Sequence, residues 1–272
     1  MVAGQARQTP PTLLETVARR IRRTPVLARS AAVWNVLRPL YDVVADRMYP
    51  QGIVWTINGM ERLALSPRLR AVGEEHEPYA WKRLMEETRP QDGVADIGSN
   101  VGIFTISFAR RLGSGGRVYA FEPDPGNLAF LLRHIALNHV SERVVPVRSA
   151  LGTVDGTIPF VTGQGAFSHV DLSRTARPVP CARFDTFFAE RRVSIVKIDV
   201  VGFEEEVLQG AQSILAQAGR RPRLIYVELL PPGEDRAGLT NDAATIRSFL
   251  QSFGYRIEMV EEPPGVLAHI SE

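Results

Sequence analysis

The sequence is poor in cysteine, in lysine and in long apolar runs. Its single cysteine, Cys181, excludes an internal disulfide and any cysteine-rich zinc or iron–sulfur site. Only two of the 32 basic residues are lysines, Lys82 and Lys197, a bias typical of a GC-rich genome. No apolar run approaches the roughly 18 residues that span a bilayer, and the N-terminus has no apolar signal core, so we expect a cytoplasmic protein without a transmembrane segment.

The composition is that of a globular protein. Hydrophobic residues make up 44% of the 272 residues and charged residues 23%, which excludes a largely disordered chain. The length predicts one full-size domain with an appendage, or two small domains. Residues 1–40 hold seven arginines against one acid, Glu15. Such a basic segment could attract a membrane surface, nucleic acid or an acidic partner, although a solvated helix face explains it equally simply.

Two helices are expected near the N-terminus. Apolar residues at helical spacing predict a short amphipathic helix over Thr12–Arg23. A second helix is expected from near Ser30 to about Met48, with an interruption or bend at Pro39 because proline lacks the N–H that a helix interior needs.

A hairpin should follow these helices. The segments IVWTI (53–57) and ERLAL (61–65) flank Asn58-Gly59, a pair that supplies the two positive-φ positions of a tight turn. We therefore interpret residues 1–72 as helices plus a hairpin that form a cap or a dimer contact, with a homodimer as one outcome.

Strands and helices alternate from about Gln91 onward, which predicts a doubly wound α/β sheet. The expected strands are 94–98, 117–122, 144–150, 194–200 and 224–229, and the expected helices are 101–112, 125–139, 203–217 and 241–253. The tail, 255–262 and 266–270, is expected to form a hairpin that closes the sheet edge. The glycine- and proline-rich stretch 151–190 breaks the alternation, so we predict an insertion above the carboxyl ends of the strands, where such folds bind ligands.

The segment from Asp96 to Gly102 is the strongest motif. Gly98 and Gly102 suit a tight turn from strand to helix, and the helix start offers free N–H groups to a ligand. A dinucleotide fold usually has a further glycine where this chain has Asn100. Asp96 would repel a pyrophosphate but would suit a cationic amine, which favours S-adenosylmethionine over NAD. A plain glycine-rich turn is the alternative.

Glu122 ends the second strand of the alternating region, 24 positions after Gly98. An acid at this point can bind both hydroxyls of a ribose. Ser149 ends the third strand, where an adenine would lie, and it is equally compatible with a loop serine that bonds its own backbone.

Four blocks in order resemble the FkbM-type S-adenosylmethionine-dependent methyltransferases. They are 96–102, AFEPDPGN (120–127), IVKIDVVGFEEEVLQGA (195–211) and LIYVEL (224–229). The resemblance implies a Rossmann-like class I methyltransferase domain over residues 73–272, with a seven-stranded, mostly parallel sheet and methyl transfer to a hydroxyl oxygen. It also implies that Asp96, Gly98, Asn100 and Gly102 hold the methionine part of the cofactor and Glu122 its ribose, with Glu77 at the amino-acid end.

One departure from the family pattern concerns the fourth strand. The family typically ends this strand Lys-Ile-Asp-Val-Glu-Gly, whereas this chain has Val201 in place of the glutamate. Glu204, Glu205 and Glu206 follow in the first turn of the next helix, where acids favour the helix dipole. One of them could substitute for the missing acid.

Methyl transfer to a hydroxyl requires a group that removes the proton, and three residues are candidates. Asp199 and Glu228 end adjacent strands, where they could act as base or orient the substrate, or could together hold Mg²⁺. His169 lies in the glycine-rich insertion, and a histidine there suits general-base work. Lys197 is expected to be structural, paired with an acid below the sheet.

The sequence therefore predicts an O-methyltransferase that acts on a small or medium metabolite, such as a sugar, glycoside or polyketide-type natural product. A non-catalytic cofactor-binding or scaffold protein with a degraded active site is the alternative, prompted by Val201. A nicotinamide oxidoreductase is disfavoured by the missing glycine, and no catalytic tetrapeptide of the nucleic-acid methyltransferases is present, so we expect no nucleic-acid partner.

Overall fold

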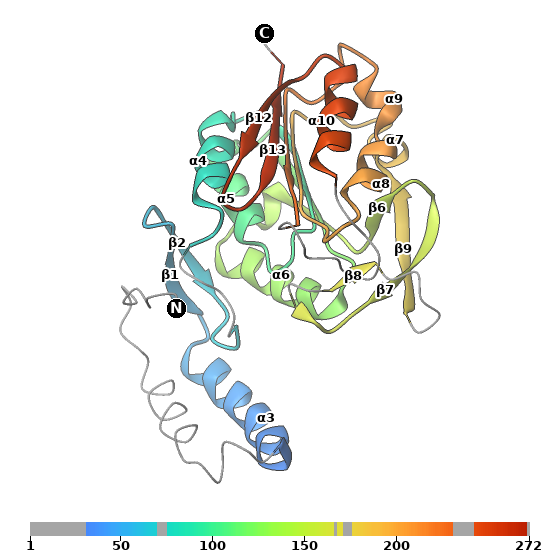
Figure 1. Ribbon diagram of the computed structural model, residues 1–272. Coiled ribbons are helices and arrows are strands. Elements are labelled where there is room, and N and C mark those ends of the chain that lie inside the picture. Colours follow the sequence, from blue (N-terminus) through green and yellow to red (C-terminus); the bar gives the residue numbers. More distant parts are fainter. Residues whose placement is uncertain (1–30, 70–74, 166–167, 171–175, 231–241, 271–272) are drawn as a thin grey trace. The chain divides into compact units, whose positions relative to one another are not determined.

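The computed structural model describes residues 31–69, 75–165, 168–170, 176–230 and 242–270 (Figure 1). The chain divides into two compact units, Met1–His76 and Glu77–Glu272, each of which is described by itself. The helix expected over Thr12–Arg23 lies outside the described residues. Within the described ranges, no helix has the length and apolar character needed to cross a membrane.

The first unit holds helix α3 (Ala31–Met48) and the hairpin of β1 (Ile53–Ile57) and β2 (Glu61–Leu65). The predicted hairpin is confirmed: the strands are antiparallel and Asn58 and Gly59 both have positive φ. Of the interruption or bend expected at Pro39, the interruption is wrong, because α3 continues through this residue. Loss of a single N–H donor does not end this helix.

The second unit contains all remaining elements, in the order α4 (Pro78–Glu87), β3 (Gly93–Ile97), α5 (Ile103–Arg111), β4 (Arg117–Phe121), α6 (Pro125–Leu137), η1 (Ser141–Arg143), β5 (Val144–Val147), β6 (Ala150–Gly152), β7 (Gly156–Val161), β8 (His169–Val170), β9 (Arg177–Arg183), α7 (Phe184–Phe187), β10 (Ile195–Ile198), α8 (Glu204–Gln209), α9 (Gln212–Leu215), β11 (Leu224–Glu228), α10 (Ala243–Ser252), β12 (Arg256–Val260) and β13 (Gly265–His269).

A seven-stranded sheet forms the centre of this unit, in the order β12-β13-β11-β10-β3-β4-β5. The five strands from β11 to β5 are parallel, and β13 is antiparallel to both of its neighbours. The expected doubly wound sheet, closed at one edge by the C-terminal hairpin, is confirmed. The strand order reverses between β3 and β10, and ligands of such sheets bind at the carboxyl ends beside this point.

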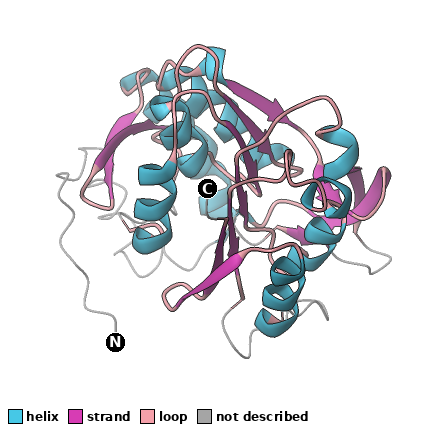
Figure 2. Cartoon of the chain, turned by 90° about the horizontal axis from the view of Figure 1, so that it is seen from above, coloured by secondary structure: helices cyan, strands magenta, loops and turns pink. Residues whose placement is uncertain are grey.

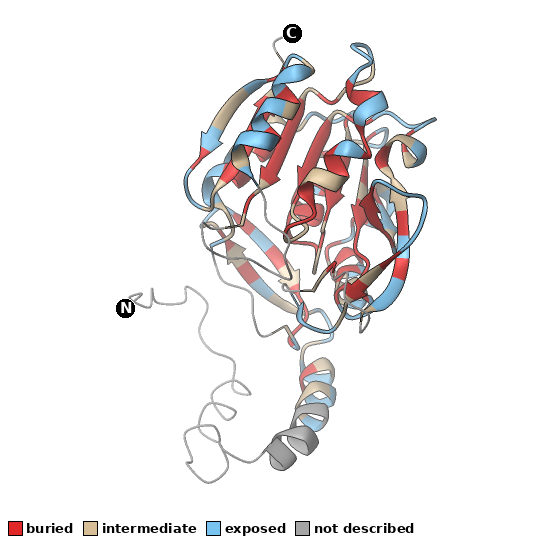
Figure 3. Cartoon of the chain, turned by 45° about the vertical axis from the view of Figure 1, so that its right-hand side comes forward, coloured by how far each residue is buried: buried red, intermediate tan, exposed pale blue. Residues whose placement is uncertain are grey.

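Helices cover both faces of the sheet (Figure 2). On one face, apolar side chains of β3, β10, β11 and β13 pack with α8, α9 and α10 into one large core. On the other face, α5 packs on β3 and β4, and the Trp81 ring of α4 contacts the Phe104 ring of α5. The strands between these layers are buried (Figure 3), which explains why they are short apolar runs in the sequence.

The stretch 151–190 forms most of a second, four-stranded sheet in the order β6-β9-β7-β8. The strand expected over 144–150 divides between the two sheets as β5 and β6. The helix expected over 203–217 divides into α8 and α9 near Gly210. A Cβ on Gly210 would lie 2.1 Å from the carbonyl oxygen of Gly152, so this close approach to β6 requires glycine.

Candidate active site

Three polar side chains form a row across the middle of the seven-stranded sheet. Asp96 of β3 pairs in register with Lys197 of β10, which pairs with Tyr226 of β11, so the three project from the same face. Their exposed fractions are 0%, 2% and 0%. Buried polar groups of this kind must be compensated by partners, and for Lys197 the partner is Asp199, two positions further along the chain.

Asp199 and Glu228 lie two residues beyond Lys197 and Tyr226, which places them on the same face at the carboxyl ends of the strands. The matching position after Asp96 is Gly98. A Cβ there would lie 1.8 Å from the carbonyl oxygen of Asp199. This glycine is therefore required by the backbone that carries Asp199, in addition to the tight turn that the sequence indicated.

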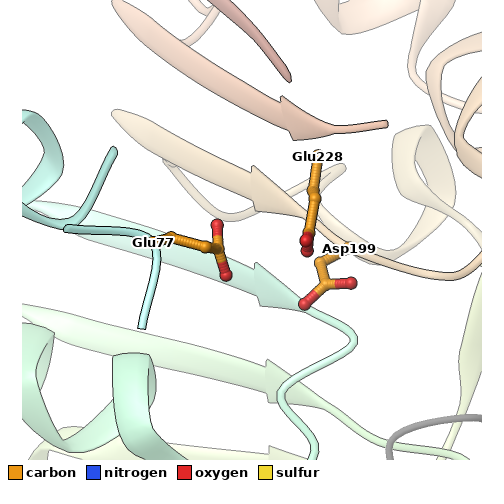
Figure 4. A group of neighbouring side chains, drawn as sticks. All are labelled: Glu77, Asp199 and Glu228. Atoms are coloured by element: carbon orange, nitrogen blue, oxygen red, sulfur yellow. The ribbon is translucent and has the colours of Figure 1, made fainter. Parts of the chain in front are cut away.

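Glu77 completes an acidic triad with Asp199 and Glu228. It precedes α4 in a left-handed conformation, with φ 40° and ψ 58°, and its side chain does not cap the helix. One carboxylate oxygen from each of the three residues lies within 4.8 Å of the other two, and the side chains converge from three separate elements (Figure 4). Oxygen ligands at this spacing could surround a cation.

Burial and repulsion between carboxylates raise the pKa values of two members of this triad, Glu77 and Glu228. Burial raises the pKa of Glu77 to about 7, against the attraction of Lys197. Burial, repulsion by Asp199 and Glu77, and a hydrogen bond with Asp199 raise the pKa of Glu228 to about 10. These two buried carboxyl groups therefore hold protons more tightly than carboxyl groups in water do.

Lys197 lies against Asp199, with its Nζ 2.9 Å from Asp199 Oδ2. The expected acid below the sheet is wrong, because alternation along the strand puts residues 197 and 199 on one face. That spacing of two was the sequence signal that could have placed the lysine in the site. Lys197 thus belongs to the same charged group as the triad.

Asp96 lies deeper than the sequence indicated. Its Oδ2 accepts a 2.5 Å hydrogen bond from the Thr105 hydroxyl, and its Oδ1 has no hydrogen-bond partner among the residues that the structure describes. Burial raises the pKa of Asp96, against the attraction of Lys197. The unsatisfied oxygen is available to a donor group of a ligand.

The turn after β3 is joined to the end of β4 by Glu122. Its Oε2 accepts a hydrogen bond from Asn100 N and its Oε1 from Asp124 N, both at 2.8 Å. Gly98, Asn100 and Gly102 all have positive φ, which explains the asparagine, since asparagine tolerates this conformation better than most residues. Burial raises the pKa of Glu122 to about 7, despite these hydrogen bonds.

Asp124 joins this region to the insertion, a role that the sequence analysis missed. One oxygen caps α6, and the other accepts hydrogen bonds from Gly163 N at 2.6 Å and the Ser168 hydroxyl at 2.8 Å. The Asp-Pro pair at a helix start was the available signal. The glycine-rich loop is therefore anchored two residues beyond Glu122.

His169 and Ser149 lie apart from the acidic triad. His169 is in β8, paired with Val161 in the four-stranded sheet, and it is not a member of the triad. The Ser149 hydroxyl donates to the carbonyl oxygen of Ala150 at 2.8 Å, and the residue is buried. Neither placement tests the roles that the sequence assigned to them.

Val201 has φ 55°, a strained conformation for a β-branched residue. Glu204 is 2% exposed and its Oε1 accepts hydrogen bonds from the backbone N–H groups of Val200 and Gly202, both at 3.2 Å. This glutamate therefore holds the loop that contains Val201, and whether it substitutes for the missing acid stays a prediction.

Comparison with known proteins agrees with this geometry. The model of the methyltransferase FkbM domain matches residues 96–257, more than half of the chain. The chain belongs to the FkbM methyltransferase family. The match begins at Asp96 and includes Glu122, Asp199 and Glu228, so the acidic strand ends all lie inside the family domain.

Two curated relatives are methyltransferases. The hexuronic acid methyltransferase AglP of Haloferax volcanii is 28% identical over 137 residues, which are 48% of this chain and 55% of AglP, so the match spans about half of that protein's length. Methyltransferase 1 of Beauveria bassiana is 27% identical over 202 residues, 64% of this chain and 76% of that protein.

A solved structure supports the fold assignment. The methyltransferase FkbM from Methylobacillus flagellatus KT superposes with a TM-score of 0.50 at 15% sequence identity, covering 94% of this chain and 58% of that one. At this identity the likeness concerns the fold alone. The class I, Rossmann-like methyltransferase fold expected from the sequence is thereby confirmed.

Proposed function

We propose that this FkbM-family methyltransferase uses S-adenosylmethionine to methylate a hydroxyl oxygen of a small or medium metabolite. The observation that carries the proposal is the acidic triad at the carboxyl ends of β10 and β11, beside the turn that Glu122 links to β4. It puts a proton acceptor next to the place where doubly wound sheets bind nucleosides.

The residues around the turn fit the proposed cofactor. Asp96 has a buried oxygen, Oδ1, with no hydrogen-bond partner among the described residues, and this oxygen could accept a hydrogen bond from the cofactor's ammonium group. Glu122 keeps further lone pairs for ribose hydroxyls beyond the two N–H groups that it already binds. The residues that would border the cofactor are Glu77, Asp96, Gly98, Asn100, Gly102, Glu122 and Ser149.

Methyl transfer requires the protein to align the acceptor with the methyl group and to remove the proton of the acceptor hydroxyl. S-adenosylmethionine supplies a methyl group on a sulfonium, which is already activated for displacement. Asp199 is our choice of general base because its carboxylate is partly exposed and ion-paired with Lys197. Burial raises the pKa of Glu228, and its protonated form would donate a hydrogen bond within the triad. His169 is the alternative base.

The proposed reaction does not use Mg²⁺, although Asp199 and Glu228 lie together as such a site would require. The Lys197 ammonium already places a positive charge against Asp199, and a second cation there would be repelled. Dialysis against EDTA should leave the methylation rate unchanged. A loss of activity that added Mg²⁺ restores would contradict this part of the proposal.

The acceptor class is proposed from the name of one relative. AglP is a hexuronic acid methyltransferase, so uronic acids and their glycosides are the first compounds to test. Purified protein would be incubated with a trideuteromethyl-labelled cofactor and a panel of sugars, glycosides and polyketide hydroxyls, and products detected by mass spectrometry.

The control for this assay is Asp199→Asn, which keeps the shape of the side chain but removes the base. Calorimetry with S-adenosylhomocysteine and with NADH tests cofactor choice separately. Binding of NADH alone would refute the proposal, and transfer that Asp199→Asn leaves intact would refute the assignment of the base.

A second candidate function is a cofactor-binding scaffold without catalysis, which Val201 favours because it removes one acid of the family pattern. Such a protein would bind S-adenosylhomocysteine yet methylate no compound of the panel. A homodimer through residues 1–72 stays a prediction, for which light scattering of the full chain is the test.

A further inference from the structure

Lys197 is a buried cation in the middle of the polar row. Its exposed fraction is 2%, its Nζ lies 4.7 Å from the centre of the Phe104 ring and 2.9 Å from Asp199 Oδ2. Removing an ammonium group from water costs several kcal/mol unless opposite charges compensate it. A lysine at this position therefore requires negatively charged groups beside its ammonium group.

Lys197 is surrounded by acidic groups from four different segments of the chain. They are Glu77 before α4, Asp96 on β3, Asp199 after β10, and Glu228 with the Tyr226 hydroxyl on β11. Burial alone would lower the pKa of Lys197, but attraction to Asp199, Glu77 and Asp96 outweighs it and raises the pKa. The ammonium form is the stable one.

Asp199 is the carboxylate that the ammonium group touches directly. We propose that Lys197 is a positioning residue for methyl transfer, an inference that rests on the proposed function. Its ammonium keeps the Asp199 carboxylate ionised and in one orientation, ready to receive the proton of the acceptor hydroxyl. Lys197 itself does not contact the acceptor.

The step that this arrangement serves balances without a further reactant. The acceptor O–H bond breaks and its proton moves to an Asp199 oxygen. The acceptor oxygen bonds to the methyl carbon, and the carbon–sulfur bond breaks with its electron pair remaining on sulfur. A protonated Asp199 could not take part, and carboxylates crowded together without a cation take up protons. Lys197→Met would create that situation.

The chain has only two lysines, which allows a direct measurement without any acceptor. Lys82 is exposed, with a side-chain exposed fraction of 63%. In full-length protein labelled with ¹⁵N-lysine, the ammonium N–H signal of Lys197 should be visible at pH 7.5, because burial slows hydrogen exchange, whereas that of Lys82 should be lost to exchange.

Two variants test whether the protected signal belongs to Lys197 and whether its ammonium group contacts Asp199. Lys82→Arg should leave the protected signal in place. Asp199→Asn should shift or broaden it, because the acceptor of the shortest contact becomes a neutral amide. A neutral Lys197 amine at pH 7.5, or a signal that Asp199→Asn does not move, would overturn the ion pair and with it the proposal.

The kinetic test uses whichever acceptor the panel identifies. Lys197→Met should lower kcat about 100-fold, at the lower end of what general-base catalysis contributes, while the KM for the cofactor changes by less than about threefold. Lys197→Arg keeps the charge and should recover part of kcat. Lys82→Met is the matched control and should keep full activity.

The outcomes separate the two proposals. An unchanged kcat in folded Lys197→Met overturns the positioning role. If Lys197→Met does not fold, the pH dependence of kcat in Lys197→Arg decides. A shift in the acidic side of this pH profile, relative to the wild type, supports the proposal. An unshifted profile contradicts it. A wild-type chain that methylates nothing refutes the proposed function, whether or not the protected ammonium signal is present.

Discussion

Gly98→Ala should destabilise the protein far more than an alanine at another positive-φ glycine. Gly98 has φ +79°, and an added Cβ would lie 1.8 Å from the carbonyl oxygen of Asp199 and 2.8 Å from its carbonyl carbon. Both are backbone atoms, which cannot rotate away as a side chain can. Either β3 or the end of β10 must therefore shift.

The magnitude follows from two separate costs. A non-glycine residue in a left-handed conformation costs roughly 1–2 kcal/mol. Relief of the overlap requires the Asp199 oxygen to move by more than an ångström, since real Cβ contacts are not below 3.0 Å, and overpacking of this kind costs about 1–3 kcal/mol. The free energy of unfolding should fall by about 2–5 kcal/mol in total.

Gly163→Ala is the matched control. Gly163 has φ +83° and nothing within 4 Å of an added Cβ, so only the backbone cost of roughly 1–2 kcal/mol applies. Gly102→Ala should be intermediate, because its Cβ would meet the Leu131 side chain at 2.5 Å, and a side chain can adjust.

Urea unfolding of the three variants measures these differences directly. Calorimetry with S-adenosylhomocysteine should add that Gly98→Ala weakens binding, since Asp199 moves with its backbone. Equal losses of stability in Gly98→Ala and Gly163→Ala would refute the reasoning, because the close approach to Asp199 would then carry no energy.

Three further predictions concern other residues. Burial raises the pKa of Glu122 from 4.5 to about 7, so its stabilising contribution is complete below pH 4.5 and is lost as the pH rises through 7. Glu122→Gln should flatten this part of the dependence of the unfolding free energy on pH. The affinity of the wild type for S-adenosylhomocysteine, measured by calorimetry, should rise up to about tenfold from pH 6 to 8. Val201→Gly should raise the free energy of unfolding by roughly 0.5–1 kcal/mol, while Asn58→Gly, at a position where asparagine tolerates φ 52°, should give no gain in the same urea assay. Cys181 is buried and its pKa is raised to about 11, so its reaction with a disulfide reagent should be at least about tenfold slower in the native than in the urea-unfolded chain.

The local features of the fold were readable from the sequence because each depends on neighbouring residues. Asn58-Gly59 predicted the hairpin, and strand–helix alternation predicted the doubly wound sheet. Carboxylates at the ends of strands followed from the same pattern, since parallel strands end at one edge. The interruption predicted at Pro39 is absent from α3, because one missing N–H does not outweigh the rest of a helix.

The arrangement within the site depended on contacts between distant segments. Glu77 meets Asp199 and Glu228 because α4 packs against α5 and Glu77, just before α4, has a left-handed conformation. Asp124 reaches Gly163 across 39 positions and Ser168 across 44, and no local pattern encodes such contacts.

By itself the sequence determined the order of strands and helices, the family and the acidic strand ends, because these follow from local spacing and short motifs. Tertiary structure alone decided which acids converge, that Lys197 lies against Asp199, and why residue 98 is glycine. Strand register and close backbone packing set those contacts, and both arise only when the whole sheet has formed.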